Sequence, residues 1–104
     1  MKQLKATLLD GLGLIDGVEH RASPVSGGSA LFYRGKEFAH FHHDHELDLR
    51  LTAKLIKAQG LSQPPDSIFH PKRSVNSPWI EIKYENVDDV VALTQLVKLA
   101  IAQL

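Results

Sequence analysis

Alternation of polar and apolar residues is clearest from Glu46 to Leu51. Leu47, Leu49 and Leu51 fall on one side of an extended chain, because successive side chains of a strand point to opposite faces. The polar side chains on the other side are Glu46, Asp48 and Arg50. The pattern predicts a strand with one buried face and one polar face.

Two further strand-like runs, Ala30–Arg34 and Glu37–His42, flank the dipeptide Gly35-Lys36. Glycine in the first place of a two-residue loop is typical of a type II′ turn, so a hairpin is predicted here. This register gives the hairpin an apolar core face made up of Ala30, Phe32, Ala39 and Phe41. The opposite face, which we call the outer face, then carries Leu31, Tyr33 and Phe38.

A three-residue loop, His43-Asp44-His45, is predicted between the second and third strands. This length pairs Phe41 with Leu47 and keeps one apolar face continuous over the three strands. On the outer face it sets two polar pairs opposite each other: His40 with Asp48, and His42 with Glu46.

Helices are predicted in three places along the chain. Leucines at helical spacing indicate a helix over about Lys2–Leu9, and Thr52 is a good N-cap for a short helix over Ala53–Gln59. Asn86 caps the last helix, which has an apolar stripe of Val90, Leu93, Val97, Ala100, Ile101 and Leu104.

A strand is also predicted over Trp79–Tyr84, and a short one over Ser67–His70, which Pro71 ends. The chain is therefore expected to form a single α+β domain over residues 1–104. Its antiparallel sheet has four to five strands with helices packed mainly on one face, in the order α-β-β-β-α-(β)-β-α.

Composition narrows the classes of function. Twelve basic residues balance twelve acidic ones, so no overall field favours nucleic acid or an anionic membrane. Cysteine is absent, which excludes disulfides, thiolate catalysis and cysteine zinc sites. No signal peptide or membrane span is apparent, so the expected location is cytoplasmic.

Four histidines within six residues are the strongest chemical signal: His40, His42, His43 and His45. His40, His42 and Asp48 offer enough donors for a divalent metal such as zinc, iron, nickel or manganese. The loop imidazoles of His43 and His45 are possible extra ligands. The same group also suits general acid–base catalysis, because a carboxylate orients a histidine. An exposed His-x-His decoration of a sheet is the simpler interpretation.

The outer face mixes these histidines with aromatic side chains, which are unusual on a face left in water. A loop, a second copy of the chain or a small ligand is expected to cover it. The candidate ligand-binding residues are Tyr33, Phe38, His40, His42, Glu46, Asp48, Arg50 and Trp79. The ligand hypothesis requires a concave pocket at the histidines, and the homodimer or partner-binding alternative requires a flat apolar patch.

Other motifs are weaker. The glycines of residues 11–17 do not follow a strand, so dinucleotide binding is rejected. The basic run His70-Pro71-Lys72-Arg73-Ser74 is interpreted as an ordinary solvated loop rather than an anion site. Nucleic-acid binding is not expected and requires one surface that gathers Lys36, Arg50, Lys72, Arg73 and Lys83.

Two stretches carry a resemblance to a known family: Arg34 to Thr52, with its His-x-His strand and following aspartate, and Trp79 to Val90 with the helix after it. They resemble a family of small bacterial domains of unknown function labelled "luciferase domain". The resemblance implies a compact, stand-alone domain without an established activity. It does not imply the flavin-dependent luciferase barrel, because 104 residues are too few to form one.

Overall fold

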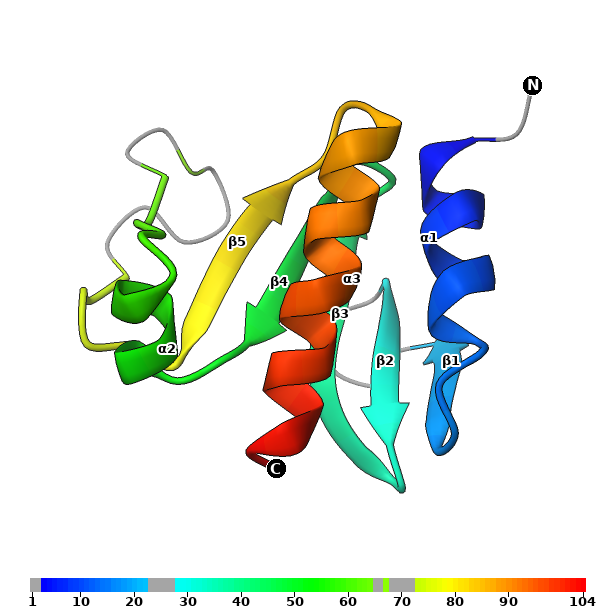
Figure 1. The fold of residues 1–104 in the computed structure, drawn as a ribbon, viewed down its shortest axis with the longest axis horizontal. Coiled ribbons are helices and arrows are strands. Elements are labelled where there is room, and N and C mark those ends of the chain that lie inside the picture. Colours follow the sequence, from blue (N-terminus) through cyan, green and yellow to red (C-terminus); the bar gives the residue numbers. More distant parts are fainter. Residues whose placement is uncertain (1–2, 23–27, 65–66, 68–72) are drawn as a thin grey trace.

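A computed structural model describes residues 3–22, 28–64, 67 and 73–104. In chain order the elements are α1 (Leu4–Leu12), β1 (Val18–Ala22), β2 (Ser29–Tyr33), β3 (Lys36–His43), β4 (Glu46–Arg50), α2 (Ala53–Ala58), β5 (Trp79–Lys83) and α3 (Val87–Ala102) (Figure 1). The predicted α+β class is confirmed, and the predicted elements that occur follow one another in the predicted order.

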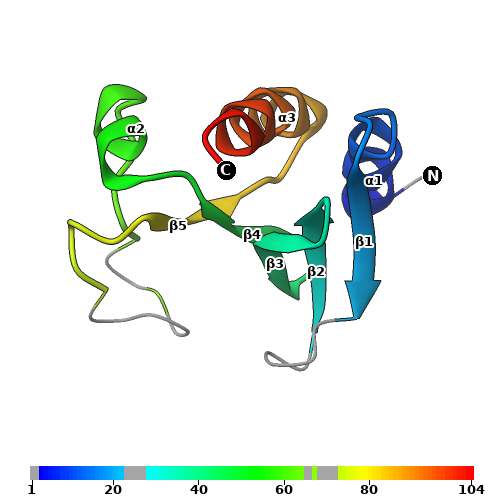
Figure 2. The same ribbon diagram turned by 90° about the horizontal axis from the view of Figure 1, so that it is seen from below.

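The five strands form one antiparallel sheet in the order β1-β2-β3-β4-β5, so each strand pairs with its neighbours in sequence. All three helices lie on one side of this sheet (Figure 2). β1 is a strand that the sequence pattern does not predict. A short strand is predicted over Ser67–His70. Ser67 does not belong to a strand, and residues 68–70 lie outside the described residues.

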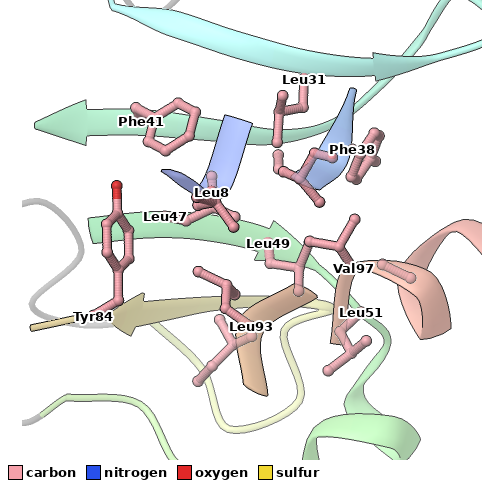
Figure 3. Close-up of a cluster of buried hydrophobic side chains, with 14 of the residues drawn as sticks. Leu8, Leu31, Phe38, Phe41, Leu47, Leu49, Leu51, Tyr84, Leu93 and Val97 are labelled. Carbon is pink, nitrogen blue, oxygen red and sulfur yellow. The ribbon is translucent and has the colours of Figure 1, made fainter. Parts of the chain in front are cut away.

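The core lies between the sheet and the helices (Figure 3). Leu47 and Leu49 of β4 and the following Leu51 are fully buried there, as their alternation predicts. Most of the predicted stripe of α3 is buried against them, namely Val90, Leu93, Val97 and Ala100. α1 adds Leu8 and Leu12 to the core. Leu12 is part of the helix because α1 continues through Gly11 rather than ending at Leu9.

Both predicted N-caps are confirmed. The Thr52 hydroxyl accepts a hydrogen bond from the Leu55 amide at 3.1 Å, and the Asn86 side chain accepts one from the Asp89 amide at 2.8 Å. Such bonds satisfy amide groups that have no partner within the helix. They fix where α2 and α3 begin, and hence how both helices meet the sheet.

The predicted register of the β2–β3 hairpin is wrong. Its turn residues are Arg34 and Gly35, both with positive φ (49° and 87°), so Tyr33 pairs with Lys36. Two consecutive positive φ values are typical of a type I′ turn, not the expected type II′ turn. The register then shifts again between Leu31 and Phe32, where β3 has one extra residue.

This irregularity exchanges the faces of several side chains. Leu31 and Phe38, predicted on the outer face, are fully buried in the core (Figure 3). Tyr33 packs against that core. Ala30 is instead the ladder partner of His40. Phe32 is not part of the core and stacks with the Arg21 guanidinium at 3.9 Å.

The connection from α2 to β5 is described at residues 59–64, at Ser67 and at residues 73–78. Two of its described residues bind outer-face carboxylates: Ser67 contacts Glu81, and Arg73 contacts Asp48. None of the helices in the described ranges combines the length and apolar content needed to cross a bilayer.

Candidate functional site

The centre of the outer face is a contact between His40 of β3 and Asp48 of β4. The two residues are ladder partners, as predicted, and His40 Nε2 lies 3.0 Å from Asp48 Oδ2. Asp48 is fully buried, and the His40 side chain is only 16% exposed. The other ring nitrogen, Nδ1, faces a carboxylate oxygen of Glu37 at 3.8 Å. His40 is thus placed between two acidic side chains.

Arg73 supplies the second partner of Asp48. Its two terminal nitrogens donate to the two carboxylate oxygens, at 2.5 and 2.9 Å, in a fork-to-fork pair. Burial alone would raise the pKa of Asp48. Hydrogen bonds from His40 and Arg73, together with their charges, outweigh burial and lower that pKa to about 2. Asp48 is therefore an anion throughout the neutral pH range.

The interpretation of the basic run at residues 70–74 as a solvated loop is wrong for Arg73. Its side chain is only 11% exposed and is bound to Asp48. His70, Pro71 and Lys72 lie outside the described residues. Because 25 residues separate Arg73 from Asp48 in the chain, no local spacing pattern indicates the pair.

His42 joins this centre from the same strand as His40. The two imidazole rings meet edge to face, with centroids 5.0 Å apart. One potential ligand atom from each of His40, His42 and Asp48 lies within 4.8 Å of the others. The structure thus brings together the three residues predicted as metal ligands, which we call the His/Asp cluster.

The predicted pairing of His42 with Glu46 is wrong, because β3 contains a second irregularity. His43 is the ladder partner of Glu46, and its Nε2 atom lies 3.4 Å from Glu46 Oε2. The turn therefore has two residues, Asp44 and His45, rather than three. His43 and His45 are exposed and lie outside the His/Asp cluster.

Glu46 has a different environment from the one that the sequence suggested. It is 3% exposed, and its Oε1 atom has no hydrogen-bond donor within the described part of the chain. Burial raises the pKa of Glu46 to about 7, and a hydrogen bond with Glu81 and the nearby charges of Glu81 and Asp48 act in the same direction. Lys83 opposes them. With a pKa of about 7, Glu46 is partly protonated near neutral pH.

Two other candidates lie beside the cluster. The Trp79 ring is tilted against His40, with centroids 5.1 Å apart, so Trp79 lies on the outer face as predicted. Arg50 is its ladder partner and is exposed. Tyr33 and Phe38 do not line this face, because the shifted register turns them toward the core.

A cavity of about 610 Å³ lies elsewhere, beside α2. It is lined by α2 and by residues of the connection to β5, and no residue of the His/Asp cluster belongs to its lining. Within the cluster, Asp48 is fully buried and the His40 side chain is 16% exposed. The ligand hypothesis requires a concave pocket at the histidines, and this cavity does not provide one.

The comparisons with known proteins add one match. The family model described as "Luciferase domain" matches residues 35–100, which is more than half of the chain. This span contains β3, β4, α2 and β5, and hence the His/Asp cluster, Arg73 and Trp79. No curated protein and no solved structure matches the chain. The chain belongs to the Luciferase domain family.

Proposed function

We propose that the His/Asp cluster is the functional site of this domain and that it binds a divalent metal ion through His40, His42 and Asp48. The observation that carries the proposal is the convergence of one ligand atom from each residue within 4.8 Å. Two imidazoles and one carboxylate suit zinc, iron, nickel or manganese.

The contact between His40 and Asp48 supports this assignment. Two ligand atoms about 2.1 Å from an ion are about 3.0 Å apart at the right angles of an octahedral site and about 3.4 Å apart in a tetrahedral one. The separation of His40 Nε2 from Asp48 Oδ2 is 3.0 Å. The ion would replace the proton that this pair otherwise shares, so binding weakens as the pH falls.

Arg73 has a supporting role in the proposal. It holds both oxygens of Asp48 and so fixes the carboxylate in one orientation, as outer-shell partners of metal ligands do. Three protein ligands leave coordination positions for water or a small ligand. Binding of a small molecule, and any catalysis, would take place at these positions beside Trp79.

The test is a calorimetric titration of untagged, chelator-treated protein with zinc, nickel, manganese and iron(II). We expect one ion per chain with submicromolar affinity for at least one metal, weakened at least about 100-fold in His40→Ala/His42→Ala. The matched control is His43→Ala/His45→Ala, which removes two histidines of the same hairpin outside the cluster. Binding that survives the first double substitution, or that the control removes equally, contradicts the proposal.

The homodimer or partner-binding alternative has lost part of its basis. It relied on aromatic and aliphatic side chains crowding the outer face, but Leu31 and Phe38 lie in the core and Tyr33 packs against it. A homodimer through this face stays a prediction that sedimentation of the metal-free and metal-loaded protein tests. The cytoplasmic location and the absence of nucleic-acid partners also stay predictions.

A further inference from the structure

The cavity beside α2 is a groove with two walls from different parts of the chain. One wall is α2 itself, and the other is the turn that contains Val75 and Asn76. The lining residues in the described part of the chain are Ala53, Lys54, Ile56, Lys57, Gly60, Leu61, Ser62, Gln63, Val75 and Asn76. A volume of about 610 Å³ lies within the range of pockets that hold small molecules.

The apolar part of the groove combines two side chains fixed by the core with one that is exposed to water. Ile56 is 5% exposed and belongs to the core, and Leu61 packs against that core, so both are held in place. Val75 is 83% exposed, although its side chain is apolar. An apolar body in the groove would contact all three side chains and remove Val75 from water.

The charged part of the lining has one sign. Lys54 and Lys57 both line the groove, and among the described residues no acidic side chain does. The chain as a whole has equal numbers of acidic and basic residues, so this is a local departure from neutrality. A ligand with a negative charge is favoured over a neutral or cationic one of the same shape.

We propose that the groove beside α2 binds a small organic anion, with its apolar body against Ile56, Leu61 and Val75 and its carboxylate or phosphate head held by Lys54 and Lys57. This site is distinct from the proposed metal site and does not depend on it. One link joins the two: the Gln63 side chain, which lines the groove, donates to the Trp79 carbonyl at 2.8 Å, and the Trp79 ring lies on His40.

The test is an NMR titration of the ¹⁵N-labelled full chain with three probes of equal chain length: octanoate, octyl phosphate and 1-octanol. We expect saturable shifts at residues 53–63 and 74–77 with both anions, and binding of octanol at least about tenfold weaker. The comparison of octanoate with octyl phosphate decides which head group is preferred.

Variants separate the two halves of the groove. Lys54→Gln/Lys57→Gln should weaken octanoate at least about tenfold and leave octanol unchanged, whereas Lys98→Gln, a change of an exposed lysine on α3, should affect neither. Val75→Ser should weaken all three probes, and Val91→Ser, at an exposed valine of α3, none. Equal binding of octanol and the anions, octanoate binding unchanged in the double lysine variant, or absence of saturation overturns the proposal. The spectra themselves show whether each variant is folded.

Discussion

Arg73 is the counter-charge of the fully buried Asp48, so its replacement by methionine should destabilise the fold. The two side chains share two hydrogen bonds, and the Arg73 side chain is only 11% exposed. Removing one partner of a buried ion pair costs about 3–5 kcal/mol, because the other charge stays buried without compensation. His40 still bonds Asp48 in this variant, so we expect about 3 kcal/mol.

Urea unfolding measures this loss directly. Trp79, the only tryptophan, lies against His40 and reports on the site by its fluorescence. With a urea dependence of about 1–3 kcal/mol per molar, a loss of about 3 kcal/mol lowers the unfolding midpoint by at least about 1 M. Asp48→Asn/Arg73→Met, which removes both charges, should lose less than the two single variants together, by about 0.5–3 kcal/mol.

Arg50→Met is the matched control for this experiment. Arg50 lies on the same strand as Asp48 but is exposed, so its replacement should change the free energy of unfolding by no more than about 0.5 kcal/mol. If Arg73→Met and Arg50→Met have the same small effect, Arg73 is not the counter-charge of Asp48, and the argument about the site fails.

Three further predictions follow from burial and charge. Phe38→Ala should lower the free energy of unfolding in urea by about 3–5 kcal/mol, since Phe38 is fully buried in the core. A loss below about 1 kcal/mol would contradict this burial. Asp48 has a lowered pKa of about 2, so its stabilisation is present above its usual pKa of 3.8 and is lost as the pH falls toward 2. Asp48→Asn should flatten this acid limb of the stability curve, and an unchanged limb contradicts the assignment. Glu46 has a raised pKa of about 7, so stability should decrease as the pH rises from about 4.5 to 7; Glu46→Gln should remove that decrease, which an identical slope in both proteins would refute.

The β3–β4 pairing could be predicted from the sequence because one face of the sheet is buried. Leu47, Leu49 and Leu51 alternate with polar residues, and a slip of one residue would turn all three toward solvent. This alternation was enough to set His40 opposite Asp48. The centre of the candidate site was therefore predictable from apolar pattern alone.

The β2–β3 hairpin could not be predicted in the same way, because its turn depends on one non-glycine residue. Arg34 adopts a positive φ of 49°, which moves the turn by one position from Gly35-Lys36 to Arg34-Gly35. Nothing in the arginine side chain favours that conformation. Phe38 is itself the extra residue of β3, because Ala39 pairs with Leu31 and Glu37 with Phe32. Strict alternation assigns Phe38 to the outer face, but it lies in the core.

Two further features have weak sequence signals for physical reasons. β1 is an edge strand whose side chains are almost all exposed, so it has no apolar alternation to detect. The partnership of Arg73 with Asp48 joins residues that only the tertiary fold brings together. A buried carboxylate needs a counter-charge, but the sequence does not say which basic residue provides it.

The central claim is that the His/Asp cluster holds a metal ion, and a crystal structure of the zinc-soaked protein with anomalous scattering measured at the zinc edge tests it most directly. We predict one dominant peak about 2.0–2.2 Å from a nitrogen of His40, a nitrogen of His42 and an oxygen of Asp48, with Arg73 still bound to that carboxylate. A dominant peak at the exposed His43 and His45, or none at saturating zinc, would contradict the claim.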